Sequence, residues 1–188
     1  MVTPTTSPPP VPDKLYGIFA GPIDQAAVQR VANNIALASQ AKVKEVHLLF
    51  QSVGGGIGEG KFLYNVFRTL PFDLVLYNAG IVASIAVIAY LGAKKRKVSA
   101  HATFMIHRTQ TTAMSANTET IKALAKAAIL ADETTESILR THINLPDDRW
   151  SEFNYHDLHF SAKEAVEFGI ADEIAEFAPP AGTQLFSI

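Results

Sequence analysis

The sequence predicts an α/β protein whose core is a largely parallel β-sheet covered on both faces. Strand-like and helix-like segments alternate along the chain. The strand-like segments, such as EVHLLF (45–50) and DLVLYN (73–78), are continuous apolar runs, which are typical of strands buried on both faces. Since reactive groups in such folds lie at the carboxyl ends of strands, the loops 51–58 and 78–84 are the first places to look for a site.

Six segments are predicted to be strands. Each is a short apolar run, and most are rich in β-branched or aromatic residues and bounded by turn-forming residues. The predicted strands span 14–21, 45–50, 73–78, 96–100, 103–107 and 170–174.

Five segments are predicted to be helices from the spacing of their apolar residues and from their end signals. In the first, Asp24 is the expected N-cap. In the last, Ser161 and Glu164 match a capping box, and Gly169 is the expected stop. The predicted helices span 24–40, 60–70, a buried stretch from about Ser84, 115–143 and 161–169.

Composition indicates one globular domain. The chain has 188 residues, of which 48% are hydrophobic, enough for one substantial core. We expect a flexible proline-rich arm at 1–13, a single domain at 14–178 and a C-terminal tail at 179–188. The arm lacks the charged head and apolar core of a secretory signal, so the expected location is the cytoplasm.

Charge and cysteine content narrow the classes of function. The formal net charge is −2, which argues against nucleic acid as the main partner, and the basic run 94–97 is interpreted as solvated surface. Cysteine is absent, which excludes disulfides and thiol chemistry.

A membrane-spanning helix is one alternative for the uncharged stretch of 20 residues from Leu74 to Ala93. Against it, DLVLYNAG has the composition of a strand that ends in a turn at Asn78 and Gly80. The helical part that remains is about a dozen residues long, the length of a buried core helix.

The glycine-rich loop QSVGGGIGEG (51–60) has three interpretations. It is neither a Walker A sequence nor a dinucleotide fingerprint, so phosphate binding has little support. A plain tight turn is one alternative. The other is that these glycines bring backbone N–H groups close to a ligand oxygen, which side chains would prevent.

Ser84 is the one serine or threonine in the apolar run GIVASIAVIAYLGA (80–93). One interpretation is that this serine is simply a small residue that packs well. The other is that it is a nucleophile and that the rest of the run belongs to the hydrophobic core. At the first turn of a buried helix, unpaired N–H groups and the helix dipole would stabilise an oxyanion beside it.

Among the six histidines, His107 follows the strand FMI directly and therefore leaves the sheet at a strand end. A lone histidine there is more often structural than catalytic. The spacing of HDLH (156–159) matches no common zinc signature, so no metal site is predicted.

Four motifs in order resemble the proteolytic subunit of the ATP-dependent Clp protease family. They are SVGGG (52–56), ASIA (83–86), FMIHRT (104–109) and FSAKEAVEFGIADEI (160–174). The family carries a Ser-Pro-Gly-Gly loop, an Ala-Ser-x-Gly/Ala serine, a Met-Ile-His-Gln-Pro histidine and a Ser-Ala-x-Glu-Ala tail. The resemblance covers roughly residues 15 to 175. It implies the ClpP/crotonase-like fold, a spiral of ββα units with a largely parallel sheet and a long protruding helix.

The resemblance implies a serine endopeptidase without cofactor or metal. Ser84 would be the nucleophile, His107 the general base and Asp157 the acidic third member. The N–H groups of Gly55 and Ile85 would form the oxyanion hole.

The same resemblance places Gly54 and Gly56 at the substrate. Asp157 is assigned by counting back four residues from Ser161, and one insertion relative to the family must then lie in 108–156. Three rivals for the acidic role lie nearby: Asp147, Asp148 and Glu152. Asp147 and Asp148 follow Pro146 and are interpreted as the start of a turn or short helix.

The implied partners are a peptide or unfolded-protein substrate and further copies of this chain in a ring, with no nucleic acid and no membrane. The segment 115–143 has more Ala, Ile and Leu than one monomer easily covers, so we expect a homo-oligomer larger than a dimer. A Clp-type ATPase is the partner with least support, because the family's N-terminal docking loop and first helix have no counterpart before residue 14. The family's glycine-rich strand after the histidine is here TQTTAMSANTE (109–119), without glycine.

Two other classes of function remain open. A crotonase-like enzyme would use paired N–H groups to polarise an acyl-CoA thioester, but it has no need of a serine nucleophile beside a histidine. An inactive scaffold subunit of the same fold is the second alternative, and the presence of all three triad residue types argues against it.

Overall fold

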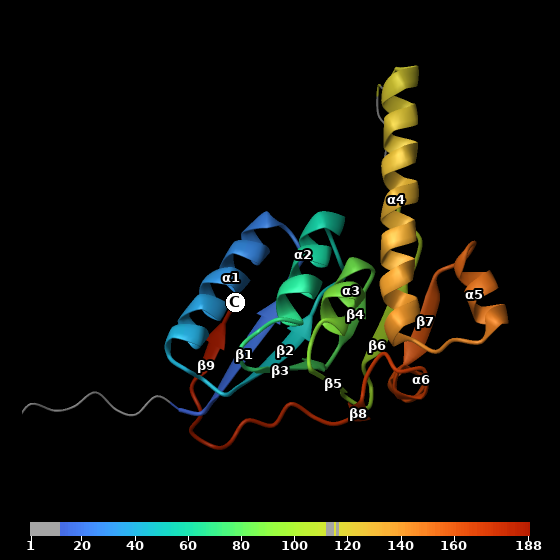
Figure 1. Ribbon diagram of the computed structural model, residues 1–188. Helices are drawn as coiled ribbons and strands as arrows, with labels where there is room; N and C mark the ends of the chain where they lie inside the picture. Colours follow the sequence, from blue (N-terminus) through green and yellow to red (C-terminus); the bar gives the residue numbers. More distant parts are fainter. Residues whose placement is uncertain (1–11, 112–114, 116) are drawn as a thin grey trace, which may run out of the picture.

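The computed structural model describes residues 12–111, 115 and 117–188 (Figure 1). The predicted arm at 1–13 therefore lies, apart from its last two residues, outside the described part of the chain. The described chain forms a mixed α/β fold with a main sheet, a second small sheet and one long helix, as the sequence predicts.

The main sheet has six strands, all parallel, in the order β8-β5-β3-β2-β1-β9. The largely parallel sheet is thus confirmed. Within the segment 179–188, which the sequence analysis sets apart as a tail, β9 pairs with β1. The strands are β1 (Lys14–Ala20), β2 (Glu45–Gln51), β3 (Asp73–Asn78), β5 (Lys95–Val98), β8 (Glu173–Ile174) and β9 (Leu185–Ser187).

Three helices cover one face of this sheet: α1 (Gln25–Gln40), α2 (Ile57–Phe67) and α3 (Ile85–Leu91) (Figure 1). The sequence predicts a sheet covered on both faces, and these three helices all lie on one of them (Figure 1). Strands β1, β2, β3 and β5 follow one another across the sheet in a single direction. Since parallel crossovers are right-handed, a one-way strand order places all the connecting helices on the same face.

The opposite face is covered in part by the chain that follows β8. Phe177 of this segment packs on the rings of Tyr16 and Tyr77, with centroids 6.2 and 5.3 Å apart. Beneath it, buried His47 stacks on Tyr16 and shares a 2.9 Å hydrogen bond with the hydroxyl of Tyr77. Aromatic side chains therefore cover part of this face of the sheet, as helices cover the other face.

The second sheet has three strands, β4 (Ile81–Ala83), β6 (Thr103–Ile106) and β7 (Leu158–Ser161). β4 and β6 are parallel, whereas β6 and β7 are antiparallel. A bridge between Ser52 and Val82 joins this sheet to the end of β2. β6 was predicted from the sequence, whereas β4 and β7 were not.

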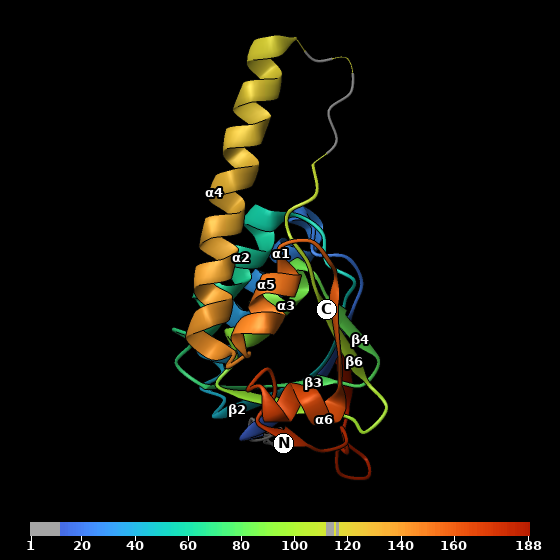
Figure 2. The same ribbon diagram turned by 90° about the vertical axis from the view of Figure 1, so that its right-hand side faces the viewer.

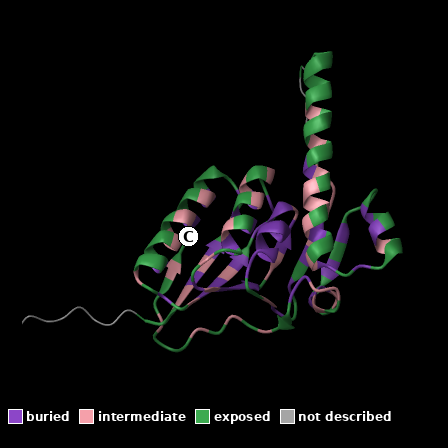
Figure 3. Ribbon diagram, viewed as in Figure 1, coloured by how far each residue is buried: buried purple, intermediate pink, exposed green. Residues whose placement is uncertain are grey.

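The long helix α4 (Thr118–His142) is confirmed, but it begins three residues later than predicted. Asn117 sets the start, because its side chain accepts a 2.9 Å hydrogen bond from the N–H of Thr120. The half of α4 near His142 packs on the body, whereas the half near Thr118 projects away from it and is exposed (Figures 1, 2 and 3).

Two short helices complete the fold, α5 (Asp147–Phe153) and α6 (Ala162–Glu167). The capping box of Ser161 and Glu164 is confirmed at α6. The helix predicted at 60–70 instead starts at Ile57, inside the glycine-rich loop, and ends at Phe67.

The uncharged stretch 74–93 is divided among β3, β4 and α3. Within the described ranges, no helix combines the length and the apolar character needed to cross a membrane. All seven residues of α3 are buried, so this run is core.

Candidate active site

Ser84 stands at a sharp turn between β4 and α3. Its backbone has φ +58° and ψ −133°, a region that costs a residue with a Cβ about 1–3 kcal/mol. The N–H of Ser84 donates a 2.8 Å bond to the carbonyl of Met105 on β6, which holds the turn in place. The Ser84 hydroxyl makes no capping bond to α3, so it is free for another partner.

That partner is His107. Its Nε2 atom lies 2.8 Å from Oγ of Ser84. His107 follows β6 directly, and β6 is paired with β4, so two neighbouring strands deliver the two side chains to one place. The Nδ1 atom of His107 is buried and has no hydrogen-bond partner in the described part of the chain.

Asp157 immediately precedes β7, the third strand of the same small sheet. β6 and β7 pair Met105 with His159 and Ile106 with Leu158, and one further step in this register places His107 opposite Asp157. Asp157 is exposed and no hydrogen bond joins it to His107. The two residues line one cavity of about 190 Å³.

The glycine-rich loop passes close to Ser84. A Cβ on Gly54 would lie 2.8 Å from the Cβ of Ser84, and one on Gly55 would lie 2.2 Å from the carbonyl oxygen of Ile23. Both glycines also have positive φ, +104° and +152°. A side chain at either position would collide with Ser84 or Ile23, so the packing of the loop requires glycine at both. The approach of the N–H groups of this loop to a ligand oxygen stays a prediction.

Gly55 and Ile85, whose N–H groups the resemblance assigns to an oxyanion hole, both line the cavity next to Ser84. Hydrogen bonds from Ile23 to the carbonyl of Gly54 (2.8 Å) and from Gly56 to that of Ile23 (2.7 Å) flank Gly55. Since peptide groups alternate along an extended chain, the N–H of Gly55 points away from Ile23. Ile85 is the first residue of α3, and its N–H has no helical partner four residues back.

Gly54 and Gly56, expected at the substrate, do not line the cavity beside Ser84. Gly54 is buried against Ser84, and Gly56 is the N-cap of α2 with an ordinary φ of −71°. In this structure both shape the loop, while Gly55 between them faces the cavity.

The cavity next to Ser84 has a volume of about 260 Å³. Its lining divides into an apolar wall and a polar rim. The wall includes Ile57, Ile85, Ile88, Ile106 and Leu139, and the rim includes His107, Arg108, Thr109, Gln110 and Thr135. Another cavity, of about 320 Å³ between α1 and the main sheet, is almost wholly apolar and is lined by no titratable or nucleophilic side chain, so it offers no chemistry.

The rival carboxylates lie elsewhere. Asp147 and Asp148 occupy the first turn of α5, where a negative charge favours the helix dipole, as the short-helix interpretation requires. Glu152 lies 3.6 Å from the guanidinium of Arg149. In the part of the chain that the structure describes, no group of three His, Cys, Asp or Glu side chains is arranged to hold a metal ion.

The sequence analysis missed the side chains that anchor the chain after His107. The N–H of Thr109 donates a 2.7 Å bond to Asp132, and Arg108 forms a 2.6 Å ion pair with Glu136. Both carboxylates are on α4. The only signal in the sequence was that Arg108 and Thr109 stand where the family has Gln-Pro.

Comparison with known proteins gives the same family as the motifs. The model of the Clp protease family matches residues 17–178. The ATP-dependent Clp protease proteolytic subunit 1 of Leifsonia xyli subsp. xyli is 27% identical over 174 residues, covering 88% of this chain and 85% of the relative. The proteolytic subunit 3 of Rhodococcus jostii is 26% identical over 169 residues, covering 86% and 83%.

The fold has a counterpart among solved structures. A ClpP1 mutant from Listeria monocytogenes superposes with a TM-score of 0.75 at 22% sequence identity, covering 86% of this chain and 91% of that chain. At this identity the likeness shows the ClpP/crotonase-like fold alone, but the family model spans most of the present sequence. The chain belongs to the Clp protease family of peptidases.

Proposed function

We propose that this chain is a serine endopeptidase that cleaves peptides or unfolded proteins with Ser84 as nucleophile and His107 as general base. One observation carries the proposal: the 2.8 Å contact between Ser84 Oγ and His107 Nε2, at a strained turn that opens onto a cavity. An acyl-CoA enzyme of this fold would not need that pair. Strain of this kind persists where the surrounding structure enforces it, and it is common at reactive residues.

In the proposed reaction, Ser84 Oγ attacks the carbonyl carbon of the scissile peptide while its proton passes to Nε2 of His107. The oxyanion of the tetrahedral intermediate accepts hydrogen bonds from Gly55 and Ile85. The C–N bond then breaks, and His107 gives its proton to the leaving amine. Water, activated by His107, hydrolyses the acyl ester and restores the Ser84 hydroxyl.

Asp157 is the proposed third member. A carboxylate on Nδ1 would hold the tautomer in which Nε2 accepts a proton, and would stabilise the imidazolium that forms. The antiparallel register of β6 and β7 supports this choice, because one step beyond its last pair, Ile106 with Leu158, Asp157 and none of its rivals would lie opposite His107. Closure of the shared cavity of about 190 Å³ would complete the contact.

The proposal includes assembly of this chain into a ring larger than a dimer. The exposed apolar residues Ile121, Ile129 and Leu130 on α4 support it, together with membership of a family of ring-forming peptidases. An ATPase partner, which the names of both curated relatives imply for those proteins, forms no part of the proposal.

The test is labelling with a fluorophosphonate probe, followed by peptide mapping. The modified residue should be Ser84, and Ser84→Ala should abolish both labelling and peptide hydrolysis while the circular dichroism spectrum stays unchanged. Labelling that persists in Ser84→Ala would refute the proposal.

A further inference from the structure

The two residues after His107 are fastened to α4. Arg108 Nη1 lies 2.6 Å from Oε2 of Glu136, and the N–H of Thr109 donates a 2.7 Å bond to Oδ1 of Asp132. Asp132 and Glu136 are four residues apart and therefore share one face of the helix. Residues 107–110 belong to no strand, so these bonds take the place of the sheet ladder that ends at Ile106.

Arg108 also reaches α5. Its guanidinium carbon lies 4.7 Å from the centre of the Phe153 ring, and its Nη2 donates a hydrogen bond to the side-chain oxygen of Asn154. Asn154 ends α5 and stands three residues before Asp157. One side chain thus joins the end of β6, the long helix and the turn that leads to the candidate carboxylate.

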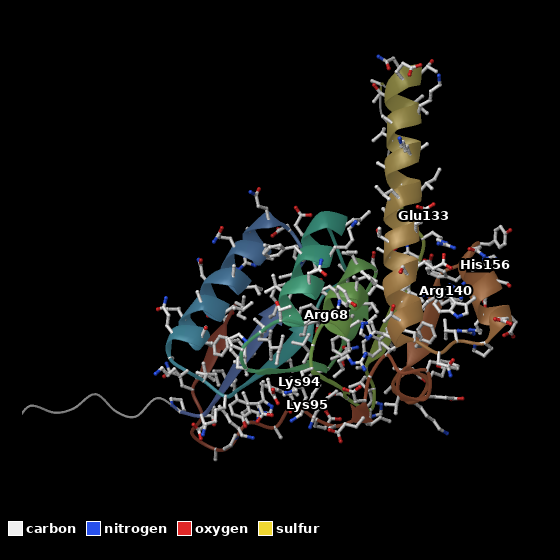
Figure 4. The ribbon with its side chains drawn as sticks, viewed as in Figure 1. Arg68, Lys94, Lys95, Glu133, Arg140 and His156 are labelled. Carbon is white, nitrogen blue, oxygen red and sulfur yellow. The ribbon has the colours of Figure 1, made fainter. Side chains whose placement is uncertain are left out.

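Glu136 binds a second arginine, which gives an internal control. Arg140 Nε lies 2.7 Å from Oε1 of Glu136, and its guanidinium covers the ring of Trp150 on α5 at 4.2 Å. Figure 4 shows Arg140 on the side of α4 toward α5. Arg108 and Arg140 therefore each form an ion pair with Glu136 and each lie over an aromatic ring of α5, but only Arg108 is next to His107.

The ion pair is sheltered. Only 27% of the Arg108 side chain and 23% of the Glu136 side chain are exposed. Burial alone would raise the pKa of the Glu136 carboxyl, but the hydrogen bonds from Arg140 and Arg108 outweigh burial and lower it. Glu136 is therefore charged at neutral pH, and its charge-assisted bonds are directional.

The imidazole of His107 needs such support. One side of the ring meets Ser84, but Nδ1 has no partner among the described residues, so no side-chain bond fixes the ring from behind. Its orientation in this structure depends on where the backbone of residues 107–109 is held.

We propose that Arg108 is a positioning residue of this peptidase: by bridging Glu136 on α4 to Phe153 and Asn154 of α5, it holds His107 against Ser84 and the 154–157 turn within reach of His107. The inference rests on the proposed function. If Arg108 has this role, the position of α4 also determines where the imidazole of His107 lies relative to Ser84.

The experiment compares Arg108→Gln, Arg108→Lys and the matched control Arg140→Gln in steady-state peptide hydrolysis and thermal unfolding. A displacement of the base by about 1 Å can cost about 100-fold in rate, so Arg108→Gln should lower kcat at least about tenfold while KM stays within about twofold. Arg108→Lys keeps the charge but not the planar fork and should recover part of the loss. Arg140→Gln should keep kcat within about twofold of wild type.

Each contrary result has its own meaning. Wild-type kcat in Arg108→Gln overturns the inference and leaves the proposed function standing. A rise in KM without a fall in kcat would make Arg108 a substrate-binding residue and would overturn the inference. An equal loss of kcat in Arg140→Gln would show that the effect comes from the stability of the α4–α5 packing, and this result would overturn the inference too. Failure of the wild-type chain to hydrolyse peptides and to react with the fluorophosphonate probe overturns the inference together with the proposed function.

Discussion

Gly54 and Ser84 are in direct contact: a Cβ added to Gly54 would lie 2.8 Å from the Cβ of Ser84 and 3.2 Å from its hydroxyl oxygen. Gly54 also has a φ of +104°. Gly54→Ala should therefore strain the loop and displace the nucleophile. We expect loss of activity and a destabilisation of about 1–3 kcal/mol in urea unfolding.

Gly58→Ala is the control for this substitution, because nothing lies within 4 Å of its added Cβ and the residue is in α2. It should be neutral or stabilising, by up to about 1 kcal/mol. Equal stability of the Gly54 and Gly58 variants would contradict the described loop.

The backbone strain at Ser84 gives a prediction of the opposite sign. Glycine adopts φ +58° freely and alanine does not, so Ser84→Gly should be more stable than Ser84→Ala. The relief of strain exceeds the usual entropic cost of glycine, and we expect a difference of about 1 kcal/mol in denaturant unfolding. Both variants should be inactive. An alanine variant at least as stable as the glycine variant would show that the turn is unstrained in solution.

Asp157→Asn tests the third member of the triad. If Asp157 orients His107, the amide should favour the wrong histidine tautomer and lower kcat by orders of magnitude. Asp147→Asn and Asp148→Asn are matched controls on α5 and should cost far less activity. Normal turnover in Asp157→Asn, with loss in a control, would move the acidic role and leave Ser84 and His107 in place.

The face opposite the helices predicts how stability depends on pH. Bonds from Lys14 and others lower the pKa of Glu45 to about 2, and burial lowers the pKa of His47. Both folded-state pKa values lie below their unfolded values, so the unfolded chain binds more protons and stability falls as pH falls. The loss of stability should begin near the unfolded pKa of histidine, about 6.5. It should continue below 4.5, the ordinary pKa of a glutamate, because there Glu45 binds a proton in the unfolded chain and not in the folded one until the pH nears about 2.

Thermal unfolding between pH 7.5 and 5.5 checks this. His47→Gln should lose less stability over that range than wild type. His142, whose pKa burial also lowers, accounts for a remaining slope. An identical pH dependence in His47→Gln would show that His47 is accessible to protons in the folded state.

Assembly is tested by light scattering. The monomer mass is 20.3 kDa, and we expect a particle of more than twice that mass at micromolar concentration. Ile129→Glu should reduce the mass, because Ile129 is 60% exposed on the projecting part of α4, whereas Lys126→Glu on the same helix should not. A wild-type mass of about 20 kDa would refute the assembly.

Much of the fold could be predicted because its signals are local. Strands β2 and β3 are apolar runs, and the capping box of Ser161 and Glu164 fixes the start of α6 within the sequence itself. What was missed depends on tertiary contacts. β4, β7 and β9 are short segments that become strands only by pairing with a partner, and the one-sided placement of the helices follows from strand order.

In the candidate site, too, the residues with local sequence signals could be predicted, and those that depend on tertiary contacts could not. Ser84 and His107 could be chosen from motifs, and the structure brings Nε2 of His107 within 2.8 Å of Oγ of Ser84. The role of Arg108 could not be predicted, because Glu136 and Phe153 are 28 and 45 residues away and come to it only through the packing of α4 and α5.

In the small three-stranded sheet, the pairing of β6 with β7 sets the position of Asp157 relative to His107. The number of residues between them in the sequence does not. One step beyond the last pair of the β6–β7 register, His107 and Asp157 would lie opposite each other, and the segment 108–156 between them contains α4 and α5. A residue inserted there lengthens a helix or a connection without altering the strand pairing, whereas a slip of one residue within β7 would turn Asp157 to the other side of its sheet. The one-residue insertion that the resemblance implies in 108–156 would therefore leave the pairing of β6 with β7 unchanged.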